Sequence, residues 1–133
     1  MFKILEKERL NPTVTRMVIE APLVARKALA GQFIILRVSE NGERIPLTIA
    51  GYDREKGSIT IIFQIVGATT FELDKKEVGD YLQDFVGPLG KPTEVEGLKD
   101  VCVVGGGVGC AIALPVARAL KEAGCNVTSI IGF

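Results

Sequence analysis

Short apolar runs separated by turn residues dominate the first 95 positions of the chain. Four runs are rich in β-branched or apolar residues and bounded by turn signals: TVTRMVIEA (13–21), QFIILRVSE (32–40), RIPLTIAGYD (44–53) and SITIIFQIV (58–66). The run 58–66 is nearly all apolar, as expected of a strand buried on both faces. The segment GDYLQDFVGPLG (79–90) predicts a further strand ending in a Gly-Pro turn. Five or six such strands predict a small antiparallel β-barrel.

The pattern shifts twice toward helix. GATTFELDKK (67–76) predicts a turn and a short helix, with Thr69 or Thr70 available as the N-cap. Beyond Gly97 the chain predicts a buried strand (98–107), a helix (110–124) and a second buried strand (126–133). Pro115 predicts that regular helical hydrogen bonding begins near it. This β-α-β order predicts a parallel sheet, so we expect a barrel over 1–96 and the start of an α/β domain over 97–133.

The composition then restricts the function. The 16 basic residues balance the 16 acidic ones, and only 6% are aromatic, which argues against nucleic-acid binding. No apolar run could span a membrane, and the charged start is unlike a signal peptide. The three cysteines have no C-x-x-C spacing, which favours reduced thiols in a cytoplasmic protein without a metal site. Because histidine is absent, any chemistry would come from a bound cofactor.

A glycine-rich turn joins the strand at 98–107 to the following helix. Gly105 and Gly107 begin a G-x-G-x-x-G spacing, but the third glycine is replaced by Cys110. The acidic residue expected about 20 positions later is also missing, because that region reads VTSIIGF. The turn can therefore either receive a phosphate at the helix N-terminus or serve tight strand–helix packing alone.

Four motifs together resemble one known family. RIPLTIA (44–50), IVGATT (65–70), GPLG (87–90) and GGGVG (105–109) follow the order and spacing of the ferredoxin–NADP reductase superfamily. The resemblance covers essentially the whole chain. It is strongest to the electron-transfer subunits, including those of NADH-dependent ferredoxin:NADP oxidoreductase, sulfide dehydrogenase and dihydroorotate dehydrogenase. It implies an antiparallel Greek-key barrel that holds FAD, followed by the first β-α-β of an NAD(P)-binding α/β domain.

The resemblance assigns roles within the first motif. Arg44 would pair with the FAD pyrophosphate, which suits a guanidinium fork. Thr48 would place its hydroxyl beside the reactive flavin nitrogen and is the candidate catalytic contact, while Pro46 and Leu47 would shape the wall beside the ring. The family more often has its arginine three residues before the hydroxyl, where this chain has Ile45. Taken without the family, Arg44 is a solvated arginine and Thr48 an ordinary strand residue.

The other motifs complete the expected cofactor sites. Gly67, Thr69 and Thr70 would receive the diphosphate at a helix N-terminus, although they also fit an ordinary helix cap. Gly87 in GPLG would lie near the cleft where flavin and nicotinamide meet, or would form a plain turn. The NAD(P) contacts would come from the glycine turn: Gly105, Gly106, Gly107 and Gly109. Cys110 could approach the cofactors, but packing is the simpler interpretation.

The implied function is electron transfer between NAD(P)H and, through FAD, an iron–sulfur carrier or partner subunit. Expected partners are a larger iron–sulfur flavoprotein subunit and ferredoxin or a similar carrier. Relatives continue past this point and carry a [2Fe–2S] cluster on cysteines that this chain lacks, so we expect the chain to be truncated. An exposed sheet edge would favour self-association. The alternatives are a barrel that binds or docks without flavin and a structural subunit of an oxidoreductase complex.

Overall fold

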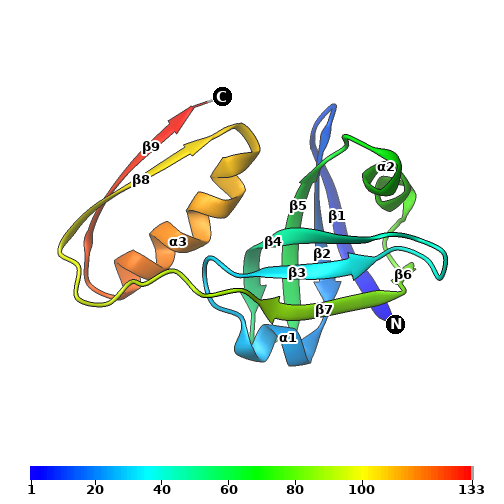
Figure 1. Ribbon diagram of the computed structural model, residues 1–133, viewed down its shortest axis with the longest axis horizontal. Helices are drawn as coiled ribbons and strands as arrows, with labels where there is room; N and C mark the ends of the chain where they lie inside the picture. Colours follow the sequence, from blue (N-terminus) through cyan, green and yellow to red (C-terminus); the bar gives the residue numbers. More distant parts are fainter. Residues whose placement is uncertain (133) are drawn as a thin grey trace.

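Seven strands from the first 89 residues form one antiparallel sheet that curls into a nearly closed barrel (Figure 1). The computed structural model describes residues 1–132. The strands are β1 (Phe2–Asn11), β2 (Val14–Glu20), β3 (Phe33–Arg37), β4 (Arg44–Asp53), β5 (Ser58–Gln64), β6 (Tyr81–Leu82) and β7 (Asp84–Leu89). Their order in the sheet is β6-β1-β2-β5-β4-β3-β7. The pairing of β2 with β5 brings non-consecutive strands together, and the predicted antiparallel barrel is confirmed.

The core lies inside the barrel and follows the alternation of the strands. On β5, Ile59, Ile61 and Phe63 are buried and point inward, as the period of two requires. The alternate positions Thr60 and Ile62 are only half-buried. The prediction that this strand is buried on both faces is therefore wrong for its outer face, which is only partly covered.

Two short helices close the ends of the barrel: α1 (Pro22–Lys27) and α2 (Ala68–Lys75). The helix at 68–75 was predicted, whereas α1 was not. Its signal is Pro22 at the first helical turn, and its C-terminal carbonyls are satisfied from elsewhere in the chain. Arg54 donates hydrogen bonds to the carbonyls of Ala25, Arg26 and Ala28, at 2.6–2.9 Å.

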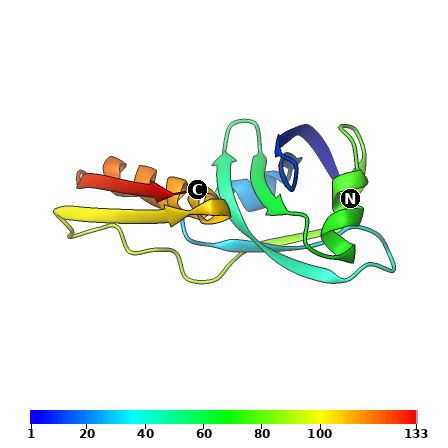
Figure 2. The ribbon, with the colours of Figure 1, turned by 90° about the horizontal axis from the view of Figure 1, so that it is seen from above.

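A small α/β unit follows the barrel and lies beside it (Figures 1 and 2). It consists of β8 (Asp100–Gly106), the 3₁₀ turn η1 (Gly107–Gly109), α3 (Cys110–Glu122) and β9 (Asn126–Gly132). β8 and β9 pair in parallel, as predicted. α3 begins at Cys110, so the prediction that regular helix starts near Pro115 is wrong. Pro115 is buried within the helix, which accommodates the one hydrogen bond that proline cannot donate.

The two strands of the α/β unit are more exposed than predicted. Val104, Ile130 and Ile131 are all more than half exposed. The reason is geometric, because α3 covers one face of a sheet that has only two strands among residues 1–132. The predicted end of the second strand at Phe133 lies outside the described residues.

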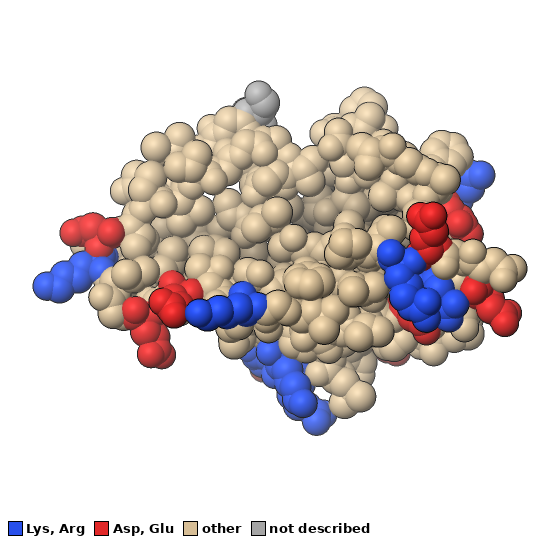
Figure 3. All heavy atoms as spheres, in the orientation of Figure 1, with Lys and Arg blue, Asp and Glu red and all other residues tan. Residues whose placement is uncertain are grey.

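The barrel and the α/β unit meet across a hollow. Figure 3 shows charged side chains at the two ends and the lower edge of one face, while the surface around the central hollow is uncharged. Helix α3 of the α/β unit borders this hollow and also contacts β4 of the barrel. The two units therefore enclose space that is largely free of charge on this face.

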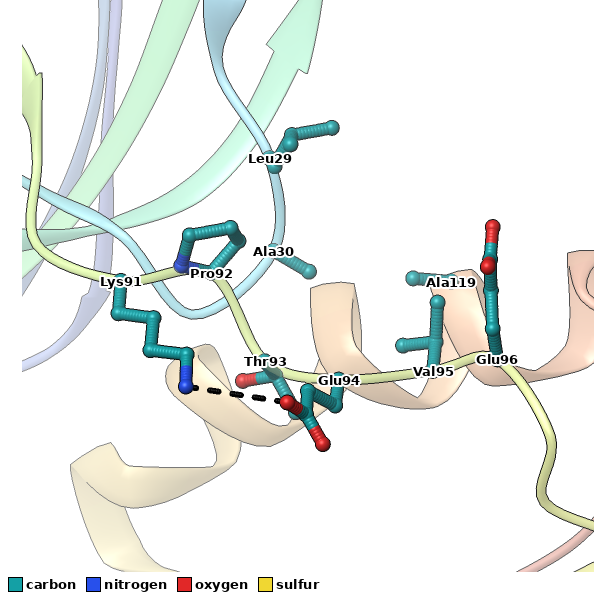
Figure 4. A pocket seen from close by; sticks show the side chains of 9 residues that line it. All are labelled: Leu29, Ala30, Lys91, Pro92, Thr93, Glu94, Val95, Glu96 and Ala119. Atoms are coloured by element: carbon teal, nitrogen blue, oxygen red, sulfur yellow. Dashed lines mark ion pairs between the residues drawn. The ribbon is translucent and has the colours of Figure 1, made fainter.

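An extended linker joins the two units and docks on the barrel. The amide of Thr93 donates a hydrogen bond to the carbonyl of Ala30, at 2.9 Å. Gly31 has φ +92°, and a Cβ on it would overlap Thr93 Oγ1 and lie 2.9 Å from the Thr93 nitrogen. Figure 4 shows the linker between the loop of Ala30 and Ala119 of α3, beside a pocket of about 470 Å³. The linker is thus fixed by backbone contacts at one joint.

Candidate functional site

A cleft of about 440 Å³ separates β4 and β5 of the barrel from the start of α3. The lining residues are Ile45, Pro46, Leu47, Thr48, Ile62, Phe63, Gln64, Val66 and Thr70 from the barrel, and Val108, Ala111 and Ile112 from η1 and α3. Three predicted site residues of the first sequence motif, Pro46, Leu47 and Thr48, are therefore brought to one wall. The opposite wall was missed by the sequence analysis, although Val108 stands inside the glycine motif.

A second hollow of about 450 Å³ lies next to this cleft. Its lining residues are Asn41, Gly42, Glu43, Ile45, Val66, Gly67, Ala68, Thr69, Thr70 and Glu72. It shares Ile45, Val66 and Thr70 with the cleft, so the two hollows adjoin. We call them together the barrel groove. Residues of two sequence motifs that lie about 20 positions apart thus meet in one groove.

The N-terminus of α2 opens into the barrel groove. Its N-cap is Gly67, so the prediction that Thr69 or Thr70 is the N-cap is wrong. The Thr70 hydroxyl instead accepts hydrogen bonds from the amides of Val66 and Gly67, at 2.9 and 3.0 Å, and Thr69 donates to Glu43. The amides of the first helical turn keep no acceptor within the helix, which makes this end suited to an anion.

Helix α2 is held against the barrel by one carboxylate. Asp74 accepts hydrogen bonds from the Thr15 hydroxyl, at 2.6 Å, and from the Arg9 guanidinium. Lys7 donates to the Asp74 carbonyl. Burial raises the pKa of Asp74. The hydrogen bonds from Thr15 and Arg9 and the charges of Arg9 and Lys7 lower it by a larger total amount, so the pKa lies below its ordinary value. These contacts join α2 to β1 and β2.

Replacing Asp74 by asparagine is expected to cost about 1–3 kcal/mol of unfolding free energy at pH 7. Because the folded pKa is lowered, the carboxylate stabilises the fold above its unfolded pKa, about 3.9, and this contribution is lost as the pH falls through the folded value. The difference between wild type and Asp74→Asn should therefore shrink in acid, which urea unfolding across pH 2–7 would measure. Glu77→Gln is the control, because Glu77 is exposed and its ion pair with Lys7 is worth little.

The four glycines of the turn after β8 divide into two groups. A Cβ on Gly105 would lie 3.1 Å from the Ala113 Cβ and 3.2 Å from the Cys110 Cα, so this glycine permits close packing of α3 on β8. A Cβ on Gly106, Gly107 or Gly109 would meet nothing within 4 Å. Gly107 also has φ +55°. The last three therefore leave open space over the start of α3, where a ligand could approach the backbone.

The remaining predicted site residues, Arg44 and Gly87, do not line the barrel groove. Arg44 is exposed on β4, and its guanidinium lies 3.4 Å from the carboxylate of Asp84, which also pairs with Arg37 at 2.7 Å. A Cβ on Gly87 would lie 2.7 Å from Ile34 Cγ2, so packing of β7 on the barrel core explains this glycine. The contact of Arg44 with a cofactor stays a prediction.

No group of three side chains of His, Cys, Asp or Glu suited to a metal ion occurs within residues 1–132. Cys102, Cys110 and Cys125 are all free thiols. Cys110 lies beside β9 next to the glycine turn, with its sulfur 4.0 Å from the carbonyl of Gly132. No helix in the described part of the chain is both long and apolar enough to cross a membrane.

Known structures share this arrangement. The solved structure of NADH-dependent reduced ferredoxin-NADP oxidoreductase, from work on flavin-based electron bifurcation, superposes with a TM-score of 0.96 at 45% identity. The match covers 99% of this chain and 48% of that one. The chain is homologous to this oxidoreductase and has a ferredoxin reductase-like fold.

The sequence relatives of this ferredoxin reductase-like chain agree with the structural match. A homologue of the electron transfer subunit of dihydroorotate dehydrogenase B from Thermotoga maritima is 45% identical over 98% of the chain, and the Shouchella clausii electron transfer subunit is 38% identical over 88%. The chain spans 46% and 47% of these proteins. Phthalate dioxygenase reductase, at 22% identity and a TM-score of 0.78, shares the fold. No family model matches the chain.

Proposed function

We propose that the chain binds FAD in the barrel groove and takes part in moving electrons between NAD(P)H and, through FAD, an iron–sulfur carrier or a partner subunit. The observation that carries this proposal is the meeting of Pro46, Leu47, Thr48 and Thr70 in two adjoining hollows. Two hollows that adjoin in this way suit a dinucleotide with a ring in one and a diphosphate in the other. The homologous electron-transfer subunits support it.

The residues of the groove fit the two ends of FAD differently. Pro46, Leu47 and Val108 offer apolar walls for the flavin ring, and Thr48 offers a hydroxyl toward its reactive edge. The amides at the start of α2 and the Thr70 hydroxyl suit the diphosphate, and Gly67 leaves room for it because a Cβ there meets nothing within 4 Å. Arg44 would approach the diphosphate by leaving its exposed ion pair with Asp84.

The open glycines after β8 suit the phosphates of NAD(P). Gly106, Gly107 and Gly109 expose backbone to the space in front of α3, whose positive dipole end favours an anion. Bound FAD would supply hydride acceptance and one-electron release. The chain itself would align the ring, exclude water with Leu47, Val108 and Ile112, and hold the Thr48 hydroxyl in place.

The partners follow from the same homology. The electron transfer subunits among the relatives belong to larger oxidoreductases, so we propose a larger iron–sulfur flavoprotein subunit as partner and ferredoxin or a similar carrier as acceptor or donor. The three free cysteines suit a reducing compartment such as the cytoplasm.

Titration of the purified chain with FAD tests the proposal. We expect the flavin's visible absorption band to shift and its fluorescence to change on binding, with weaker binding of FMN because it fills one hollow of the two. Arg44→Ala is expected to weaken FAD binding about tenfold, or 1.4 kcal/mol. Arg26→Ala on the exposed face of α1 is the charge-matched control. A folded chain that ignores FAD would disprove the proposal, and unchanged affinity in Arg44→Ala would remove that residue from the site.

A further inference from the structure

A third cleft lies between the barrel and the far half of α3. It has a volume of about 370 Å³. Residues of β1, β2, β4, β5 and the turn after β4 form one side, and Leu114 and Arg118 form the other. It shares Ile62 with the barrel groove but none of the residues assigned to FAD or NAD(P). We call it the α3 cleft. Its lining is mostly polar, unlike the apolar wall of the groove.

Three cations from three separate elements line the α3 cleft: Arg16 of β2, Lys56 of the turn after β4, and Arg118 of α3. Within residues 1–132, Lys56 and Arg118 form no ion pair. Arg16 has only a loose one, with its Nη1 3.8 Å from Glu6 Oε1. Three cationic side chains thus line one cavity, and ion pairs with acidic residues of the chain neutralise little of their charge.

Two carboxylates, Glu6 and Asp53, line the cleft, and Asp53 already has hydrogen-bond donors. One carboxylate oxygen of Asp53 accepts hydrogen bonds from the amides of Glu55 and Lys56, both at 3.0 Å, and so stabilises the turn. The cleft therefore holds three cations and two carboxylates. Asp53 accepts hydrogen bonds from backbone amides, and Glu6 forms only the loose ion pair with Arg16. The remaining charge in the cleft is positive.

Hydroxyl groups complete the donor set. Ser58 and Thr60 of β5 line the same cleft, and Ser58 is buried with 5% exposure. Neither hydroxyl donates to another side chain in the part of the chain that the structure describes. Guanidinium forks, an ammonium and hydroxyls around one cavity match a tetrahedral oxyanion, which accepts several hydrogen bonds at once.

We propose that the α3 cleft binds a small phosphate-bearing anion, with Arg118 contacting it from α3 and Arg16 from the barrel. Such an anion bridges two units that the chain connects through one docked linker. It thereby restrains the distance between β5 and α3, which also form the two sides of the barrel groove at Ile62 and Ile112. Occupancy of the α3 cleft should therefore influence the width of the groove.

Isothermal titration of the flavin-free chain with inorganic phosphate at low ionic strength tests this inference, and it does not depend on the proposed flavin function. We expect saturable binding in the wild type and at least about fivefold weaker binding in Arg118→Gln. Lys121→Gln is the matched control, because Lys121 lies on the same helix, is exposed and does not line the cleft. Its affinity should equal that of the wild type.

A second variant, Arg16→Gln, tests the barrel side of the cleft and should weaken phosphate binding by a similar factor. Circular dichroism of each variant checks that the fold is kept. The inference is overturned if the wild type shows no saturable binding. It is equally overturned if Lys121→Gln loses as much affinity as Arg118→Gln, which would indicate general charge attraction, or if succinate binds and phosphate does not.

Discussion

Replacing Gly67 by aspartate is expected to weaken FAD binding by about 30-fold or more without destabilising the fold. Gly67 is the N-cap of α2 with φ −160° and ψ −177°, an extended conformation open to any residue. A Cβ there meets no neighbour within 4 Å. Aspartate is also a favoured N-cap, so the helix should gain stability. A carboxylate at this position would oppose the diphosphate, and a cost of about 2 kcal/mol corresponds to the expected loss.

Gly67→Asn is the matched control for this experiment. Asparagine has the same shape and a similar N-cap preference but no charge, so its FAD affinity should stay near that of the wild type. Fluorescence titration gives the affinities, and thermal unfolding gives the stabilities. Equal losses in the two variants would contradict a charged diphosphate at the start of α2, and no loss in either would move the cofactor elsewhere.

Gly31→Ala is expected to destabilise the fold by about 2–4 kcal/mol. Two effects add. Gly31 has φ +92°, which strains a side chain, and the new Cβ would overlap Thr93 Oγ1 in the docked linker. The linker backbone cannot yield without losing the hydrogen bond from Thr93 to Ala30. We therefore also expect proteolysis within the linker to accelerate.

Gly79→Ala separates these two effects. Gly79 has φ +95°, but a Cβ on it would meet nothing within 4 Å. This variant should show only the backbone strain, about 1–2 kcal/mol. Chemical denaturation gives the free energy of unfolding of both variants. The difference between their losses measures the cost of the contact with Thr93. If the two variants lose the same stability, the linker does not depend on the joint at Gly31.

The strands and the parallel β-α-β were predictable because each depends on local pattern. Alternating β-branched runs with turn residues between them determine β2 to β5, and the glycine turn between an apolar run and a helical pattern determines the α/β unit. The groove was partly predictable for a similar reason. Residues 46–48 and 67–70 each carry a recognisable motif, although only the fold brings them together.

The features that were missed depend on contacts distant in sequence. Helix α1 has six residues and is completed by Arg54, about 28 positions further along the chain. The N-cap of α2 was predicted at Thr69 or Thr70 instead of Gly67, because a hydroxyl at N3 and one at the N-cap look alike in sequence. Gly105 and Gly106 are neighbours, yet one packs against α3 and the other faces open space. Only the backbone direction separates such positions.

The attachment of α2 has a consequence for the order of folding. The helix is held by Asp74 to Thr15 and Arg9, which lie 59 and 65 positions earlier. During synthesis all residues of β1 and β2 are therefore made before the helix that they hold, and the long loop between them must close before α2 can dock. The start of α2, where the diphosphate is proposed to bind, is thus expected to form late, and a flavin supplied during refolding should bind only after the slowest of these long-range contacts has formed.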